Sequence, residues 1–328
     1  MKQELFSEAP PLVREFLGYQ STVKGRSPKT VEEYYLDLRT FFRYLKYSSG
    51  NISAEVSFEE ISISDVTETM ITSVTLTQVF EYMNFLISER NNHAASRQRK
   101  TSSLRMFYKF LTNQKHLIDV NPLQQLESPK LKKSLPKYLT LEQSLELLNT
   151  IDGSNKERDY CMVTLFLNCG MRLSELVGLN VSDIRSGSSV VRITGKGNKE
   201  RIVYLNDACK AALDSYLAVR PRDGLKDRDA LFISKQHKRI SPKTVQHIVK
   251  KYLAEIDLKS GGYSVHKLRH TAATLMYQHG NVDIRVLKDI LGHENLGTTE
   301  IYTHLSDKQM ENAANANPLS KVKPKDKK

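Results

Sequence analysis

Hydrophobic residues recur in the first third of the chain at spacings of three and four, the period of a helix that buries one face. The longest stripe follows Ser27-Pro28, which supplies a helix cap and a proline at the first helical position. Its members are Val31, Tyr35, Leu38, Phe42 and Leu45. Further stripes start at Val79 and Leu104. The pattern predicts a small helical bundle for residues 1–127.

Two polar segments interrupt the periodic pattern. Residues 47–65 are polar and irregular, which predicts a loop or a short ordered insert. Residues 128–137 contain four lysines, two prolines and no acids. Because proline discourages regular structure, residues 128–139 are predicted to be a basic linker between two domains, able to cross a DNA backbone.

Helical periodicity resumes after the linker, where Thr140 caps a helix with the sequence TLEQSLELLNTI. Further helices are predicted at 157–169, 174–179, 207–219, 242–256, 266–279 and 283–291. One stretch differs, because residues 189–194 and 200–205 alternate and are rich in β-branched side chains. They flank the glycine and lysine residues of 195–199, which predicts an antiparallel hairpin with a lysine at its tip.

The predicted fold class is therefore mainly α, with a single small antiparallel β-hairpin. The predicted boundaries are an N-terminal helical bundle at 1–127, the linker at 128–139, a second domain at 140–312 and a C-terminal arm with a basic tail at 313–328.

Charge adds information about the partner. Lysine and arginine total 49 against 37 acidic residues, and the pI is near 9.4. This balance favours a polyanionic partner such as nucleic acid. Residues 1–127 hold 15 basic and 15 acidic side chains, so the surplus lies from residue 128 onward. Positions 90–118 nevertheless contain no acid, which is typical of a phosphate-facing helix and also of an ordinary solvated helix face.

The basic residues expected to contact DNA come from this helix, the linker and the hairpin. They are Arg97, Arg99, Lys100, Arg105, Lys130, Lys132, Lys133, Lys199 and Arg201.

Several classes of protein are disfavoured. No stretch approaches the roughly 20 apolar residues that cross a bilayer, and the N-terminus lacks the apolar core of a secretory signal. Cys161, Cys169 and Cys209 lack CxxC spacing, so they predict small buried residues rather than disulfides or a zinc site. A cytoplasmic protein associated with the nucleoid is expected, without a membrane partner.

Five motifs carry a resemblance that spans nearly the whole chain. They are GMRLSEL around Arg172, TGKGNKER around Lys196, HKLRHTAAT around His266 and Arg269, LGHENLGTT around His293, and IYTHL around Tyr302. In order and spacing they resemble the tyrosine recombinases of the phage integrase family, most closely the bacterial Xer recombinases of the XerC/XerD type. The resemblance implies a SAM-like core-binding domain followed by a mostly α catalytic domain.

The resemblance also implies a catalytic set, made of Arg172, Lys196, His266, Arg269, His293 and the nucleophile Tyr302. Tyr302 would form a 3′-phosphotyrosyl link, which stores the energy of the broken bond without ATP. Lys196 would protonate the departing oxygen, and the nearby Lys199 is a rival for that role. Glu175 would hold Arg172 or a neighbouring histidine in place.

The chemistry of these residue types agrees with the implied roles. A planar guanidinium binds two phosphate oxygens at once, so Arg172 and Arg269 suit the non-bridging oxygens. His266 lies three residues before Arg269 on the same helix face and titrates near neutrality. His266 and His270 have the i, i+4 spacing of metal ligands, but HKLRH lacks the glutamate of HExxH. Neither a metal nor another cofactor is predicted.

The expected function is site-specific recombination of DNA through a Holliday junction, in chromosome dimer resolution or in mobile-element integration and excision. The partners implied are double-stranded DNA with inverted half-sites and a homo- or hetero-tetramer of recombinase protomers, with an activating protein left open. Two alternatives are DNA relaxation like that of a type IB topoisomerase, and DNA binding by a catalytically silent relative.

Overall fold

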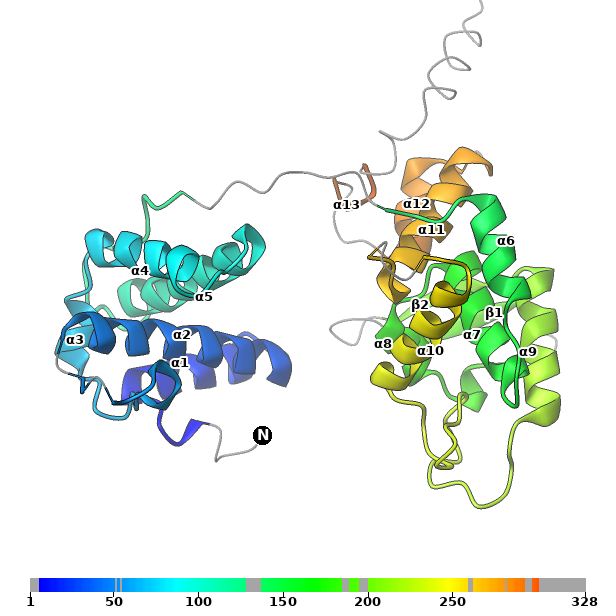
Figure 1. Ribbon diagram of the computed structural model, residues 1–328, viewed down its shortest axis with the longest axis horizontal. Helices are drawn as coiled ribbons and strands as arrows, with labels where there is room; N and C mark the ends of the chain where they lie inside the picture. Colours follow the sequence, from blue (N-terminus) through cyan, green and yellow to red (C-terminus); the bar gives the residue numbers. More distant parts are fainter. Residues whose placement is uncertain are drawn as a thin grey trace, which may run out of the picture. The chain divides into compact units, whose positions relative to one another are not determined.

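The computed structural model describes residues 6–50, 52–53, 55–127, 137–184, 189–194, 200–258, 262–280, 282–292 and 297–300. The chain divides into two compact units, Met1–Lys133 and Ser134–Lys328 (Figure 1). Each unit has a hydrophobic core of its own, and each is described separately.

The first unit is a helical bundle, which confirms the predicted fold class. Its elements are α1 (Pro11–Thr22), α2 (Pro28–Ser48), the short 3₁₀ helix η2 (Phe58–Glu60), α3 (Glu68–Thr72), α4 (Leu76–Ser88) and α5 (Ala94–Asn113). Ser27 caps α2 by accepting a hydrogen bond from the backbone N–H of Thr30 at 3.2 Å. Helices α1 and α3 were not singled out by the periodic pattern.

Aromatic side chains fill the core of the first unit. The rings of Phe16 and Phe42 both meet the edge of Phe107, which joins α1, α2 and α5. Residues of the 47–65 segment contribute as well, since Ile61 and Ile63 are buried. This segment is therefore an ordered insert that packs on the bundle.

The second unit is also mainly helical. Its elements are α6 (Leu141–Asn149), α7 (Lys156–Cys169), α8 (Leu173–Gly178), the 3₁₀ helix η3 (Val181–Asp183), β1 (Val190–Thr194), β2 (Glu200–Tyr204), α9 (Asp207–Val219), α10 (Pro242–Glu255), α11 (Val265–Gln278), α12 (Ile284–Leu291) and α13 (Gly297–Glu300). Strands β1 and β2 pair antiparallel, with Val191 opposite Val203, which confirms the predicted hairpin.

Helix α7 lies at the centre of this unit and is buried on nearly every side. It packs against α9 and α11, as Figure 1 shows. Cys161, Cys169 and Cys209 are buried free thiols, as predicted, and the sulfurs of Cys169 and Cys209 lie 3.6 Å apart. Because α7 is fixed by packing, the turn that follows its last residue is a rigid platform for whatever projects from it.

Candidate active site

Arg172 is the N-cap residue of α8, two residues beyond the end of the turn that closes α7. One Nη donates to Oε1 of Glu175 at 2.7 Å, and the other donates to the carbonyl of Gly292 at 2.8 Å. The Arg172 side chain is 35% exposed to solvent. The guanidinium is thus held on one edge by protein and is open to solvent elsewhere.

Arg269, on α11, is almost completely buried and, like Arg172, contacts the C-terminal end of α12. Its two Nη atoms donate to the carbonyls of Gly170 and Leu291, each at 2.6 Å. Since Arg172 bonds the next carbonyl after Leu291, the two guanidinium groups sit on consecutive peptide units. The structure therefore brings together two of the arginines predicted from sequence positions almost a hundred residues apart.

Glycine is required at both turns that supply these carbonyls. Gly170 caps α7 with a φ of +59°, and a Cβ there would lie 2.7 Å from Cδ2 of Leu291. Gly292 caps α12 with a φ of +62°, and a Cβ there would lie 3.0 Å from Arg201. The close approach of the two helix ends brings the carbonyls of Gly170, Leu291 and Gly292 beside the arginines.

His266 lies one turn before Arg269 on α11 and is exposed. Desolvation by the surrounding protein, together with the positive charges of Arg269, Lys267 and Arg172, lowers the pKa of His266 below its ordinary value of 6.5. Its ring meets the edge of the His270 ring, with centroids 4.6 Å apart. A neutral imidazole next to two guanidinium groups can accept a proton at neutral pH.

Glu175 is the carboxylate at the centre of this cluster, and its side chain is 1% exposed. Burial by itself would raise the pKa of the Glu175 carboxyl, but hydrogen bonds from Arg201 and Arg172 outweigh it and lower that pKa. Arg201 is one of the residues expected from the sequence to contact DNA. In the structure its guanidinium instead bonds Glu175, and its side chain is 15% exposed.

Three predicted catalytic residues, Lys196, His293 and Tyr302, lie outside the described residues, and so does Lys199. The chain places them at the borders of described elements. Lys196 follows β1, His293 follows the Gly292 turn, and Tyr302 comes two residues after α13. The described part of the site therefore consists of Arg172, His266 and Arg269 with their supports.

The basic residues of α5 are largely engaged within the first unit. Arg99 and Lys100 both bond the carboxylate of Asp37 on α2, at 2.7 and 3.2 Å, and Asp37 is fully buried. Ser103 donates to the same carboxylate at 2.7 Å, and Arg99 also pairs with Glu33. The acid-free stretch 90–118 thus pairs with acids from other segments, which lie on α2, on η2 (Glu59 with Arg90) and on α1 (Glu15 with Lys115). Lys100 is 8% exposed, so it faces protein rather than solvent.

Two further arginines of this helix bond main-chain carbonyls. Arg97 donates to the carbonyl of Asn92 at 2.6 Å, and Arg105 donates to the carbonyl of Leu126 at 2.5 Å. Lys130, Lys132 and Lys133 lie outside the described residues.

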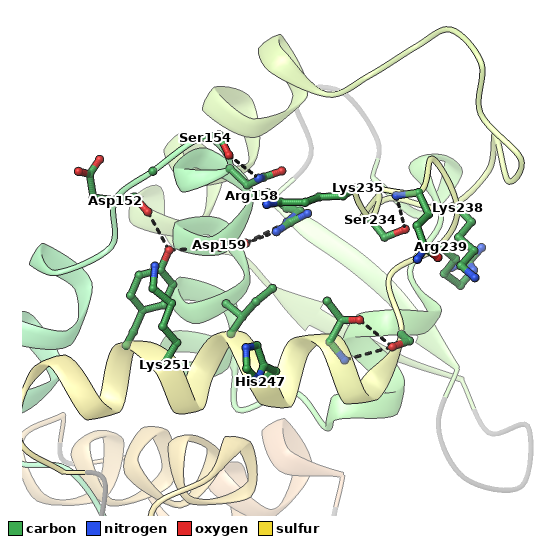
Figure 2. A pocket seen from close by; sticks show the side chains of 17 residues that line it. Asp152, Ser154, Arg158, Asp159, Ser234, Lys235, Lys238, Arg239, His247 and Lys251 are labelled. Atoms are coloured by element: carbon green, nitrogen blue, oxygen red, sulfur yellow. Dashed lines mark hydrogen bonds and ion pairs between the residues drawn. The ribbon is translucent and has the colours of Figure 1, made fainter.

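A basic recess in the second unit was not found by sequence reasoning. Its volume is about 610 Å³, and it lies between the start of α7, the turn 233–239 and one side of α10. In Figure 2, His247 and Lys251 project from α10 and face the region of Arg158 and Asp159. No single motif could have indicated this recess, because its cations come from three separate segments.

The cations of the recess differ in how free they are. Arg158 is buried, bonds Asp159 and donates to the carbonyl of Ile233 at 3.0 Å. Lys235 and Lys238, on the exposed turn, make no ion pair or side-chain hydrogen bond with any residue that the structure describes. These two lysines can therefore meet an external anion without first breaking a bond inside the protein.

Within the described ranges, no group of three or more histidine, cysteine, aspartate or glutamate residues could hold a metal ion. Across the same ranges, no helix combines the length and apolar character needed to cross a membrane.

Comparison with known proteins adds independent information. The model of the phage integrase family matches residues 137–309. The chain is 54% identical over 322 residues to tyrosine recombinase XerC of Caldanaerobacter subterraneus subsp. tengcongensis, an alignment that covers 97% of this chain and 91% of the relative. It is 31% identical to tyrosine recombinase XerD of Halalkalibacterium halodurans, covering 91% and 94% of the two chains.

Solved structures show the same fold. The post-cleavage complex of XerH site-specific recombinase with palindromic difH substrate aligns with a TM-score of 0.69 and 20% identity, over 93% of this chain and 84% of that chain. A lambda integrase dimer bound to a COC′ core site aligns with a TM-score of 0.61 and 17% identity, over 89% and 75%.

Proposed function

The chain belongs to the phage integrase family, within the Xer-type tyrosine recombinases, and from this premise we propose that Tyr302 is the nucleophile of a site-specific DNA recombinase. The observation that carries the proposal is the convergence of Arg172, Arg269 and His266 at the facing ends of α7 and α12. Two fixed positive charges and a proton acceptor thus lie beside the end of α12, which precedes Tyr302 in the sequence, and this supports the proposal.

The first step is a transfer of the phosphoryl group. The Tyr302 oxygen attacks the scissile phosphorus and loses its proton to His266, while the bond from phosphorus to the 5′-oxygen breaks. Lys196 gives a proton to that oxygen, which leaves a 5′-hydroxyl and a 3′-phosphotyrosyl link. Rejoining reverses the step with a 5′-hydroxyl from another strand as the nucleophile and Tyr302 as the leaving group, so no ATP is consumed.

Charge stabilisation is assigned to the two arginines. As the phosphorus becomes five-coordinate, negative charge grows on its non-bridging oxygens, and Arg172 and Arg269 would each meet one of them. His293 would donate a further hydrogen bond. Because Arg269 is buried and already oriented by two carbonyls, little reorganisation is needed when the phosphate enters.

We propose that the recess in the second unit makes more contacts with the DNA backbone than α5 does. Lys235 and Lys238 are exposed and unpaired among the described residues, whereas Lys100 and Arg105 are engaged inside the first unit. Phosphate contacts supply much of the affinity for DNA. The lysines of 128–133 and Lys199 remain candidates for the same role.

At the level of assembly and biology, we propose a tetramer of protomers on two duplexes with inverted half-sites, acting at the nucleoid to resolve chromosome dimers. The Xer relatives support this role over mobile-element excision, and they do not favour a topoisomerase or a silent binder. Loss of the gene should then leave dividing cells with unresolved dimers, scored as filaments with unsegregated DNA.

The proposed chemistry is tested by trapping the covalent intermediate. A nicked duplex with dif-like inverted half-sites is incubated with the protein in EDTA and resolved on a denaturing gel, with binding scored in parallel. Wild type should form an adduct, and Tyr302→Phe should bind equally well and form none. Specific binding by wild type without an adduct would contradict the assignment of an autonomous enzyme.

A further inference from the structure

Arg201 is a charged residue at an inward-facing position of a strand. Along β2 the side chains of Ile202 and Tyr204 are exposed, whereas Val203 is buried and Arg201 is only 15% exposed. Its Nε is buried and has no hydrogen-bond partner among the described residues. Burial of a guanidinium at such a position costs desolvation free energy. The partner that offsets this cost therefore indicates what the residue does.

That partner is Glu175, whose carboxylate is saturated by two arginines. Arg201 donates to Oε1 at 2.5 Å and to Oε2 at 3.0 Å. Arg172 donates its Nη1 to Oε1 and its backbone N–H to Oε2, each at 2.7 Å. With four donors from two chain segments, the carboxylate has one position available, and that position sets the direction of the Arg172 guanidinium.

Charge balance suggests a role for Arg201. Glu175 carries one negative charge, and a pair with Arg172 alone would neutralise the charge that Arg172 must offer to the phosphate. Arg201 provides the compensating positive charge. The three side chains together therefore keep one net positive charge, which is located on the partly exposed Arg172.

Arg201 also supports the second anchor of Arg172. A Cβ placed on Gly292 would lie 3.0 Å from both Cδ and Nη1 of Arg201, so the side chain packs directly against that turn. The Gly292 carbonyl is the acceptor of Arg172 Nη2 at 2.8 Å. Both groups that orient Arg172 are thus in contact with Arg201.

We propose that Arg201 is a positioning residue that orients Arg172 through Glu175 and the Gly292 turn, and that it links the lysine-bearing hairpin to the phosphate-binding arginine. The inference rests on the proposed function, in which Arg172 meets the scissile phosphate. It gives Arg201 a role within the protein, in addition to the DNA contact expected from the sequence.

The test compares two arginines of the same hairpin. Arg201→Met removes the inward residue, and Arg192→Met removes an outward residue whose side chain is 61% exposed. Both variants lose one positive charge. On the nicked dif-like duplex, Arg201→Met should slow adduct formation at saturating protein by up to about 100-fold, as misplacement of a positioned group does. Its affinity for the duplex should match that of Arg192→Met.

A second comparison separates positioning from general damage to the fold. A duplex whose scissile phosphate carries a methyl group in place of one non-bridging oxygen needs less positive charge from Arg172. The deficit of Arg201→Met should therefore shrink on this duplex, and Arg201→Lys should restore part of the rate on the ordinary one. A deficit of equal size on both duplexes would mean a structural role and would overturn the inference.

A double-mutant cycle tests the route through Glu175. If Arg201 acts through that carboxylate, Glu175→Gln combined with Arg201→Met should lose much less than the product of the two single losses. Full additivity, or an affinity loss beyond that of Arg192→Met, would overturn the inference. Absence of an adduct with wild type would instead overturn the proposed function, and with it the premise for Arg201.

Discussion

Arg172 and Arg269 differ in the acceptors that orient them. Two main-chain carbonyls, at the ends of α7 and α12, accept hydrogen bonds from Arg269, whereas one carbonyl and the Glu175 carboxylate accept those of Arg172. Carbonyls at helix C-termini lack intrahelical partners and carry partial negative charge, so they are favourable sites for a guanidinium. Arg172 depends in part on a titratable side chain, so its direction is sensitive to substitution of Glu175.

The lowered pKa of His266 leads to a prediction at this scale. Desolvation and the charges of Arg269, Lys267 and Arg172 disfavour the imidazolium, so His266 stays neutral to a lower pH than a free histidine. Lys267→Met removes one of these charges from a residue outside the reacting set. An NMR titration should show a His266 pKa below 6.5 in the unmodified protein and a higher one in Lys267→Met.

The titration has a built-in control. Lys288→Met removes a charge from α12 that is not among the causes of the His266 shift, so it should leave the titration unchanged. An unchanged His266 curve in Lys267→Met would contradict the contribution of the Lys267 charge to the lowered pKa.

At the scale of elements, the contact of α2 with α5 depends on one buried carboxylate. Asp37 is fully buried and accepts hydrogen bonds from Arg99, Lys100 and Ser103. Asp37→Asn would leave the buried Lys100 without a compensating charge and would remove one of the two acids that pair with Arg99, which should destabilise the first unit by about 3 to 5 kcal/mol. Chemical denaturation followed by circular dichroism measures this change.

Glu33→Gln is the matched control for Asp37→Asn. It removes the other acid that pairs with Arg99, but the Glu33 side chain is 44% exposed. Exposed pairs contribute little, so the expected loss is about 0 to 1 kcal/mol. Equal losses for the two variants would contradict the view that burial makes the Asp37 pair important.

The ends of α7 and α12 allow a second prediction at this scale. Gly170→Ala introduces a left-handed alanine and a Cβ 2.7 Å from Leu291, whereas Gly224→Ala has a similar φ of +65° and comes no nearer than 3.7 Å to His237. The backbone strain is shared and costs roughly 1 kcal/mol. Gly170→Ala should lose about 1 to 3 kcal/mol more because of the steric overlap, measured by thermal unfolding.

The sequence predicted the helices and strands more fully than it predicted the contacts between residues far apart in the chain. Periodic stripes and alternation identified α2, α4, α5 and the β1–β2 hairpin, because the residues that define them are near neighbours in the chain. The short helix α3 lacked enough turns to show a stripe. The ion pairs of Arg99 and Arg201 were not predicted, because their acids, Asp37 and Glu175, lie 62 and 26 residues away. A local charge count cannot find such partners.

At the scale of the whole molecule, the positive charge is concentrated after residue 127, where the basic surplus lies. The double variant Lys235→Met, Lys238→Met removes two lysines from the recess in the second unit. If both contact phosphates, the slope of log affinity against log salt should fall by about 2, because each contact releases close to one counterion. Fluorescence anisotropy over a salt series measures the slope.

Equal loss of net charge elsewhere provides the control for the lysine pair. Lys29→Met, Lys210→Met removes one exposed lysine from α2 and one from α9, where Lys210 pairs with Asp207. This variant should keep the wild-type slope. Slopes that fall equally in both double variants would show that overall charge, rather than the recess, determines the salt dependence.

The main-chain anchoring of the arginines also bears on protein engineering. The three carbonyls that receive Arg172 and Arg269 belong to Gly170, Leu291 and Gly292, so they cannot be supplied by grafting side chains onto another scaffold. A designer who wished to transplant this pair of arginines would have to rebuild two helix ends at van der Waals distance, with a glycine closing each. The backbone of both helix ends would therefore have to be transplanted together with the two arginines.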